Sequence, residues 1–117
     1  MWRDLWDSGA VVTNGTDVPV ERINPIPGYY ASVSRLLADG SRFFPEQRMT
    51  REEALQSYTL NNAYAAFEED EKGSLELGKL ADITVLSQNL LTVEEEKIPD
   101  TVVVYTIVGG EVVYEND

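Results

Sequence analysis

Asp17 is the residue of this sequence that is best placed for chemistry. A short run of apolar and β-branched residues, Ala10–Asn14, stops at Gly15; Asp17 follows, and Pro19 then stiffens the chain. This pattern predicts a buried strand that ends in a tight turn and presents a carboxylate beyond its C-terminal end. In α/β folds, catalytic and ligand-binding groups gather at that end of the strands. The competing interpretation is that Asp17 only shapes the turn.

The composition limits the chemistry available to the chain. Histidine and cysteine are both absent, so the chain supplies no imidazole base, no thiol and no disulfide. A metal held by these residues alone would therefore need oxygen ligands. The 117 residues suit one domain or a piece of a larger one, and a hydrophobic content of 43% argues against a disordered chain.

The charge balance bears on partners and location. The 21 acidic residues outnumber the 9 basic ones and give a formal net charge of −12. Such a field repels nucleic acid and anionic membranes, so we expect neither as a partner. No apolar run approaches the ~20 residues needed to cross a bilayer, and no signal-type apolar core follows the first residues. We therefore expect a cytoplasmic protein.

Two helices are predicted on either side of the strand. The first ends before Gly9 and carries one apolar stripe at helical spacing. This stripe consists of Trp2, Leu5 and Trp6. It needs a partner surface, which is either the core of this chain or another chain. The second helix is expected from Asn24, whose side chain can cap it, to Gly40.

A third helix is predicted over Thr50–Phe67. Thr50 and Glu53 have the spacing of a capping box, in which each side chain accepts a hydrogen bond from the other residue's main-chain N–H. The acidic run Glu68–Glu71 follows the helix. We interpret it as a solvated surface rather than a calcium loop, because the alternating ligand spacing and the central glycine are missing.

The second half of the chain is predicted to be an antiparallel sheet. Its turn-rich entry, three strands and intervening loop are Gly73–Asp82, Ile83–Leu86, Ser87–Asp100, Thr101–Val108 and Glu111–Tyr114. Gly109–Gly110 joins the last two strands as a two-residue hairpin turn, since glycine tolerates the positive φ angles that such turns need.

Four stretches of the sequence, taken together, resemble a known family. They are Asn14–Val20 (NGTDVPV), Ser57–Ala65 (SYTLNNAYA), Gly73–Leu86 (GSLELGKLADITVL) and Thr106–Tyr114 (TIVGGEVVY). In this order, and over nearly the whole chain, they resemble the amidohydrolase superfamily, in particular amidohydrolase family 3. The third stretch is the most specific. It departs from the family pattern at Leu77, where proline is usual, and we expect this to cost only loop rigidity.

The resemblance implies an α/β fold of which this chain is one portion. The family fold is a (β/α)₈ TIM barrel with a small composite β-sandwich built from both ends of the chain. Residues 1–66 would be the C-terminal end of the barrel, with its last strand and flanking helices. Residues 67–117 would be the antiparallel strands that return to the sandwich.

The resemblance also implies a reaction. In the family, the aspartate that matches Asp17 is both a metal ligand and a catalytic residue. It takes a proton from a metal-bound water that attacks an amide-like carbon of a small molecule. The metal is divalent and usually zinc, and its histidine ligands lie upstream of the part that this chain matches. We therefore expect no stoichiometric metal and no activity in this chain alone.

A second class of function stays open, in which the chain is a stand-alone acidic interaction or scaffold module without catalysis. If the chain is part of an enzyme, the partner is a small-molecule substrate bound by the intact protein. For the isolated chain we expect self-association, or association with the missing N-terminal portion. The reason is that Ala10–Asn14 has no parallel partner strand here and would leave an unpaired edge.

Overall fold

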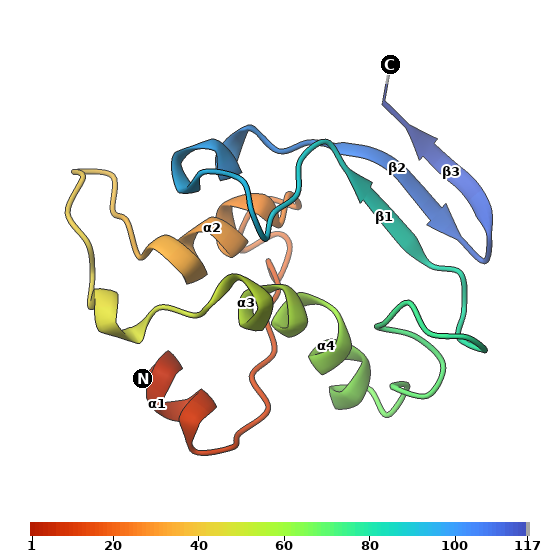
Figure 1. Cartoon of the computed structure of the whole chain (residues 1–117), viewed down its shortest axis with the longest axis horizontal. Helices are drawn as coiled ribbons and strands as arrows, with labels where there is room; N and C mark the ends of the chain where they lie inside the picture. The colour runs from red at the N-terminus through yellow and green to blue at the C-terminus, as the bar shows by residue number, and fades with distance from the viewer. Residues whose placement is uncertain (117) are drawn as a thin grey trace.

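The computed structural model describes residues 1–116 and shows helices on one side of the molecule with a sheet extending from them (Figure 1). In chain order the elements are α1 (Trp2–Asp7), α2 (Ile26–Ser34), the 3₁₀ helix η1 (Pro45–Gln47), α3 (Arg51–Tyr58), α4 (Leu60–Ala65), β1 (Ile83–Leu86), the 3₁₀ helix η2 (Glu95–Asp100), β2 (Val103–Val108) and β3 (Glu111–Glu115). The helices thus come first and the strands last. Within the described residues no helix is long and apolar enough to span a membrane.

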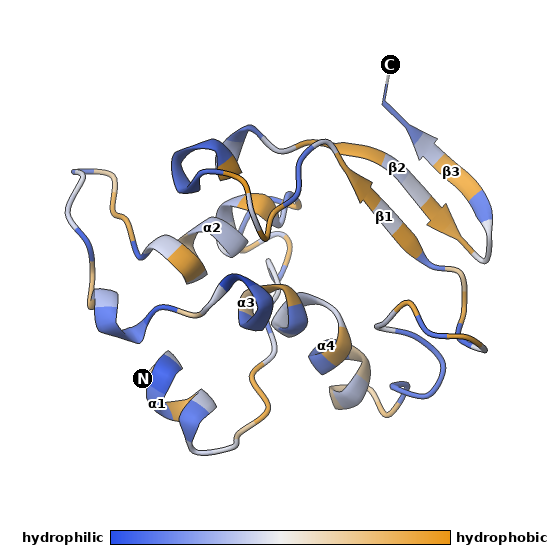
Figure 2. Ribbon diagram, viewed as in Figure 1, coloured by the Kyte–Doolittle hydropathy of each residue, from blue (hydrophilic) through white to orange (hydrophobic). Residues whose placement is uncertain are grey.

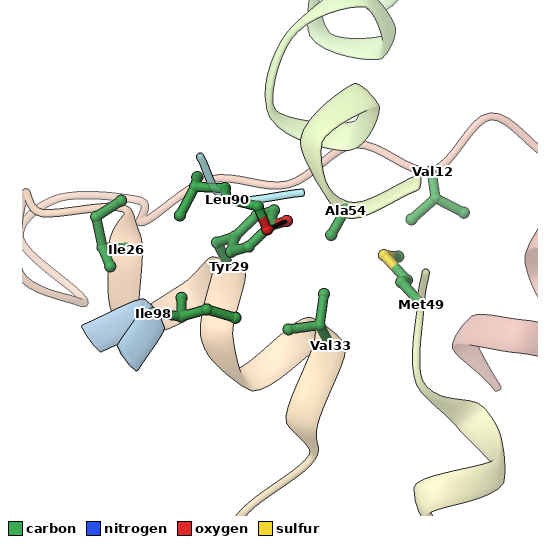
Figure 3. Packing of buried hydrophobic residues seen from close by; sticks show 8 residues of the cluster. All are labelled: Val12, Ile26, Tyr29, Val33, Met49, Ala54, Leu90 and Ile98. Carbon is green, nitrogen blue, oxygen red and sulfur yellow. Dashed lines mark hydrogen bonds between the residues drawn. The ribbon is translucent and has the colours of Figure 1, made fainter. Parts of the chain in front are cut away.

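The hydrophobic core lies among α2, α3 and the segment that contains η2 (Figure 3). Its members are Val12, Ile26, Tyr29, Val33, Met49, Ala54, Leu90 and Ile98. The Tyr29 hydroxyl of α2 links α3 to the segment before η2, because it lies 3.2 Å from the carbonyl oxygen of Arg51 and 3.3 Å from that of Leu90. Ile98 is completely buried, so the stretch predicted only as a loop supplies part of the core.

The predicted first helix is confirmed as α1, and Gly9 follows it with a φ of +84°. Trp6 packs against the core, whereas 46% of Trp2 is exposed. Trp6 thus packs α1 against this chain, whereas nearly half of Trp2 stays exposed.

Helix α2 begins at Ile26 with Pro25 at its N-cap, one residue later than Asn24 as the cap would place it. Asn24 nevertheless bonds the helix start, because its Oδ1 accepts a hydrogen bond of 3.0 Å from the N–H of Ile26. The predicted extension to Gly40 is wrong, since α2 ends at Ser34. Arg35 takes a left-handed conformation with φ of +55°. Its main-chain carbonyl accepts a bond of 2.8 Å from the N–H of Phe43, and its Nε donates to the Phe43 carbonyl at 2.9 Å. These bonds to a later segment turn the chain out of the helix.

The capping box at the start of α3 is confirmed. The N–H of Thr50 donates to Glu53 Oε2 at 2.8 Å, and the N–H of Glu53 donates to Thr50 Oγ1 at 3.2 Å. Arg3 of α1 binds the same carboxylate with both Nη atoms, the Nη1–Oε1 distance being 2.8 Å. The hydrogen bond from Arg3 lowers the pKa of the Glu53 carboxyl. One glutamate therefore caps α3 and fastens α1 to it.

The predicted single helix over Thr50–Phe67 is wrong: it is two helices, α3 and α4, separated at Thr59. Thr59 has φ of −124° and ψ of −93°, which is not helical. The hydroxyls of Ser57 and Thr59 donate to main-chain carbonyls about one turn earlier, at 2.7 and 2.9 Å. Such side-chain bonds compete with the regular helical ladder and favour its interruption here.

The sheet has the order β1-β2-β3 with both pairs antiparallel. Gly109–Gly110 forms the predicted turn with φ of +58° and +85°, and Val108 faces Glu111 across it. The strand predicted over Thr101–Val108 begins at Val103. Hydrophobic residues occupy much of all three strands (Figure 2), yet every residue of β3 is exposed. The sheet therefore carries apolar surface that the described residues leave uncovered.

The prediction of a strand over Ala10–Asn14 is wrong for this chain. These residues have no regular secondary structure, and the described part of the chain contains no parallel pair of strands. The segment is nevertheless anchored, because Val12 is buried at one end of the core, next to Ala54 and Met49 (Figure 3). A strand is defined by pairing with a neighbour, and here the neighbours are helices.

Candidate functional site

Asp17 lies in an exposed turn directly after the anchored segment. Its φ is +47°, and its carbonyl accepts a hydrogen bond of 2.8 Å from the N–H of Val20. A second bond of 3.1 Å, from the N–H of Glu21 to the carbonyl of Thr16, joins the residues on either side of this turn. Within residues 1–116 the Asp17 carboxylate makes no hydrogen bond or ion pair. This carboxylate is therefore available to a group supplied from elsewhere.

The segment that leads to Asp17 is held by hydrogen bonds from the junction between α3 and α4. The side-chain amide of Asn61 donates to the Val12 carbonyl at 2.8 Å. The amide of Asn62 donates to the Asn14 carbonyl at 2.9 Å. The main-chain N–H of Asn14 donates to the carbonyl of Ser57 at 2.9 Å. These three bonds satisfy main-chain groups that would otherwise need a neighbouring strand.

Helix α2 holds the same segment through one further side chain. Asn14 Nδ2 donates to Ser32 Oγ at 3.0 Å, and Ser32 Oγ donates in turn to the Gly28 carbonyl at 2.9 Å. The Asn14 Oδ1 accepts from the N–H of Gly15 at 3.1 Å. Asn14 is thus bonded through its side chain and its main chain at the point where the chain turns toward the candidate residue.

Sequence reasoning found Asp17 but missed these anchoring residues. Asn61 and Asn62 fall within the predicted helix over Thr50–Phe67, and that prediction gives them no anchoring role. Two successive asparagines within a predicted helix were a usable signal, because asparagine is a poor interior helix former and prefers to hydrogen-bond main-chain groups. Their targets, 48 to 49 residues away in sequence, carry no such signal.

The residues described here do not fit a complete metal site. No group of three or more histidine, cysteine, aspartate or glutamate residues comes together among residues 1–116. Zinc in proteins normally takes at least three protein ligands. Asp17 can contribute one carboxylate ligand, and any others would have to come from a further polypeptide.

Two open hollows lie elsewhere on the molecule, and Asp17 lines neither. The first, of about 780 Å³, lies between α1, η1 and the start of α3 and includes Arg3, Arg48 and Glu95. The second, of about 740 Å³, lies between α3, α4 and β1. It is mainly apolar, and its lining includes Leu55 and Tyr58. Burial raises the pKa of the Tyr58 hydroxyl. The candidate site is therefore an exposed turn rather than a pocket of this chain.

The sequence is similar to one protein family and to several longer proteins. The sequence matches the amidohydrolase family over residues 1–114. It is 31% identical to the N-substituted formamide deformylase of Arthrobacter pascens, over 97% of this chain and 21% of that protein. It is 34% identical to the protein LONG AFTER FAR-RED 3 of Arabidopsis thaliana, over 97% of this chain and 20% of that protein. An imidazolonepropionase of Porphyromonas gingivalis is 33% identical over 97% of this chain and 25% of its own length.

A solved structure shares the fold. An amidohydrolase from Thermotoga maritima superposes with a TM-score of 0.71 at 23% sequence identity, covering 96% of this chain and 25% of that one. The chain therefore spans about a fifth to a quarter of the length of the proteins that it matches.

Proposed function

Because the chain belongs to the amidohydrolase family, we propose that it is the C-terminal part of a metal-dependent enzyme that hydrolyses C–N bonds, other than peptide bonds, of a small molecule. The match over residues 1–114 supports this proposal, as do relatives named N-substituted formamide deformylase and imidazolonepropionase. The observation that carries it is Asp17, an exposed carboxylate without an internal partner at the end of an anchored segment.

We assign to Asp17 the role of a proton acceptor for the attacking water, which is the task that a positioned carboxylate performs in general base catalysis. Amidohydrolases are generally metal-dependent, and our proposal includes a divalent metal, zinc, for the intact enzyme. The described residues offer it one carboxylate only. The remaining ligands, and with them the substrate pocket, belong to the part of the enzyme that this chain does not contain.

The proposal divides the chain as the resemblance implies. Residues 1–66 would complete the barrel, and Ala10–Asn14 would become a true strand once neighbouring strands lie beside it. Residues 67–117 would complete the β-sandwich. The uncovered apolar residues of the antiparallel sheet support this part of the proposal, because such surface usually packs against something.

We also propose a cytoplasmic location and a small-molecule substrate rather than nucleic acid or membrane. The formal net charge of −12 and the absence of cysteine are compatible with both statements. Cell fractionation of the native host tests the location.

A chimera tests the function. The matched region of the Arthrobacter pascens relative is replaced by this chain, and hydrolysis of an N-substituted formamide is measured in the presence of zinc. We expect activity, and a loss of at least about 100-fold in Asp17→Asn. The control is Asp70→Asn, which changes another exposed aspartate. A folded chimera without activity, or one in which both variants are equally active, contradicts the proposal. The first outcome favours the scaffold module.

A further inference from the structure

The main-chain groups of Val12 and Asn14 are bonded as if a strand lay beside them. In an extended chain, the N–H and C=O of one residue point to the same side, and residues two apart share that side. The three bonded groups are the Val12 carbonyl, the Asn14 N–H and the Asn14 carbonyl. All three are bonded to the junction between α3 and α4, as one edge of a strand is bonded to its partner, and we call them the edge of Val12 and Asn14.

The junction between α3 and α4 supplies both the donors and the acceptor for this edge. In an uninterrupted helix the Ser57 carbonyl would accept from the N–H four residues later, but here it accepts from Asn14. The interruption at Thr59 makes this possible. Asn61 and Asn62 come two and three residues after Thr59, and their amides donate to the two carbonyls of the edge. The helix break is thus the feature that lets a pair of helices substitute for a strand.

Burial makes these bonds consequential. Asn61 is 7% exposed and Val12 is 7% exposed, so a carbonyl that lost its donor there would have no water to replace it. Asn14 and Asn62 are half-buried. A change at Asn62 therefore perturbs the edge without placing a new charge deep in the core.

We propose that Asn61 and Asn62 are positioning residues for the Asp17 turn, acting through the edge of Val12 and Asn14. The bonds to Asn14 fix the direction in which the chain leaves the segment, and the turn that carries Asp17 begins within a few residues of it. This inference rests on the proposed function only in giving Asp17 a role; the positioning itself is a property of the chain. It predicts that the turn keeps its direction even where no partner strand is present.

Amide hydrogen exchange of the full chain, followed by NMR, tests the positioning. Asn62→Asp keeps the side-chain shape but places an acceptor against the Asn14 carbonyl. We expect exchange at the Asn14 N–H to accelerate by at least about tenfold relative to the N–H of Met49, a core amide that donates to Ser32. Asn62→Gln retains a donor and should restore part of the protection.

Thr50→Ala is the matched control, because it weakens the other end of α3 without touching the edge. It should raise exchange at Asn14 and Met49 together. Equal acceleration at both amides in Asn62→Asp, no acceleration at Asn14, or no protection of Asn14 in the unmodified chain overturns the inference. The measurement does not depend on metal or activity, so an inactive chimera would not alter the exchange rates or their interpretation.

Discussion

At the scale of single residues, the part of the chain that the structure describes holds one candidate catalytic group, Asp17, and the hydrogen bonds that fix the segment before it. Asp17 is exposed and has no internal partner, whereas Asn61, Asn62 and Ser57 fix the segment that leads to it. Preorganisation of this kind is what a catalytic carboxylate needs, because a misplaced base loses most of its effect. In the proposed enzyme, this chain would contribute Asp17 on a segment that is already fixed.

Metal content follows directly from this arrangement. With no histidine in the sequence and Asp17 as the one candidate ligand, the purified chain should hold no stoichiometric transition metal after dialysis. Elemental analysis by mass spectrometry measures this. One tightly bound metal per chain would contradict the expectation, unless gel filtration shows that several chains combine their ligands.

The ion pair between Arg3 and Glu53 should make stability depend on pH. The pKa of Glu53 is lowered in the folded state, chiefly by the hydrogen bond from Arg3. Its contribution is therefore present above the unfolded value of about 4.3 and is lost as the pH falls through the folded value. We expect Glu53→Gln to cost about 1 kcal/mol at pH 7 and less at acidic pH.

Urea unfolding at neutral and acidic pH measures this difference. Glu52→Gln is the control, since Glu52 is exposed in the same helical turn. If Glu53→Gln and Glu52→Gln lose equal stability at both pH values, Glu53 is not the coupling between α1 and α3.

At the scale of elements, turns and helix ends follow local rules, and interruptions follow contacts with distant segments. The β2–β3 hairpin and the start of α3 depend on residues adjacent in sequence. The ends of α2 and α3 depend on Phe43 and on the edge of Asn14. Glycines in this chain are accordingly required for two reasons, the backbone angles of a turn and close packing against a helix.

The hairpin turn is a matter of conformation. Gly109 and Gly110 have positive φ, and a Cβ at either position would meet no atom closer than 3.9 Å. Replacing both with valine should cost about 1 kcal/mol or more through the backbone alone. Gly15→Val is the control, because Gly15 has open space around it and no positive φ. An unchanged unfolding midpoint in the double variant would mean that the turn does not need these angles.

Gly73 is a matter of close packing as well. A Cβ there would lie 2.7 Å from the Cβ of Ala63 and 3.0 Å from the Cα of Leu60, both in α4. Gly78 has nearly the same φ, +96° against +94°, but nothing within 4 Å. We expect Gly73→Ala to be less stable than Gly78→Ala by about 1–3 kcal/mol, measured by thermal unfolding. Equal losses would show that the loop does not pack tightly on α4.

At the scale of the whole molecule, α2, α3 and the segment of η2 share a core, and the sheet lies largely outside it (Figure 1). Apolar side chains are exposed at both ends of the chain, including Trp2 at 46%, Val11 at 50% and Val113 at 61%. Scattered apolar residues are ordinary on a protein surface, but contiguous ones usually mark an interface. The arrangement suits a part that packs against a larger body.

For the isolated chain we expect self-association, most simply as a two-fold dimer that buries α1 and residues 10–14; the other outcome consistent with the sequence is poor order over the first ~40 residues. The formal net charge of −12 on each copy should make the dimer tighter at higher salt, which screens the repulsion. Light scattering at two salt concentrations, combined with amide exchange at Val11 and Val12, measures both.

A variant pair identifies the surface that associates. Trp2→Glu should abolish the dimer, whereas Val113→Glu on β3 should leave it intact, and the reverse result would place the interface on the sheet. A strictly monomeric chain at high concentration, with strong protection at Val11 and Val12, would contradict both outcomes and mean that this chain has a compact fold of its own.

Local sequence was sufficient for the features whose causes lie within a few residues. The Thr50–Glu53 capping box, the Gly109–Gly110 turn and the end of α1 before Gly9 are all as predicted. In each case the hydrogen bonds or backbone angles involved are made by neighbours in the chain. The choice of Asp17 as a site residue also rests on short stretches of sequence, and its role stays a prediction.

Long-range contacts set the rest. Whether Ala10–Asn14 is a strand depends on a partner, and its main-chain groups pair instead with Ser57, Asn61 and Asn62, more than forty residues later. These bonds are made where the helix is interrupted at Thr59. Ile98 is a core residue because helices distant in sequence bury it. Periodicity can show that a segment is apolar and extended. It cannot show which group satisfies each main-chain N–H and C=O, because that depends on which segments meet in space.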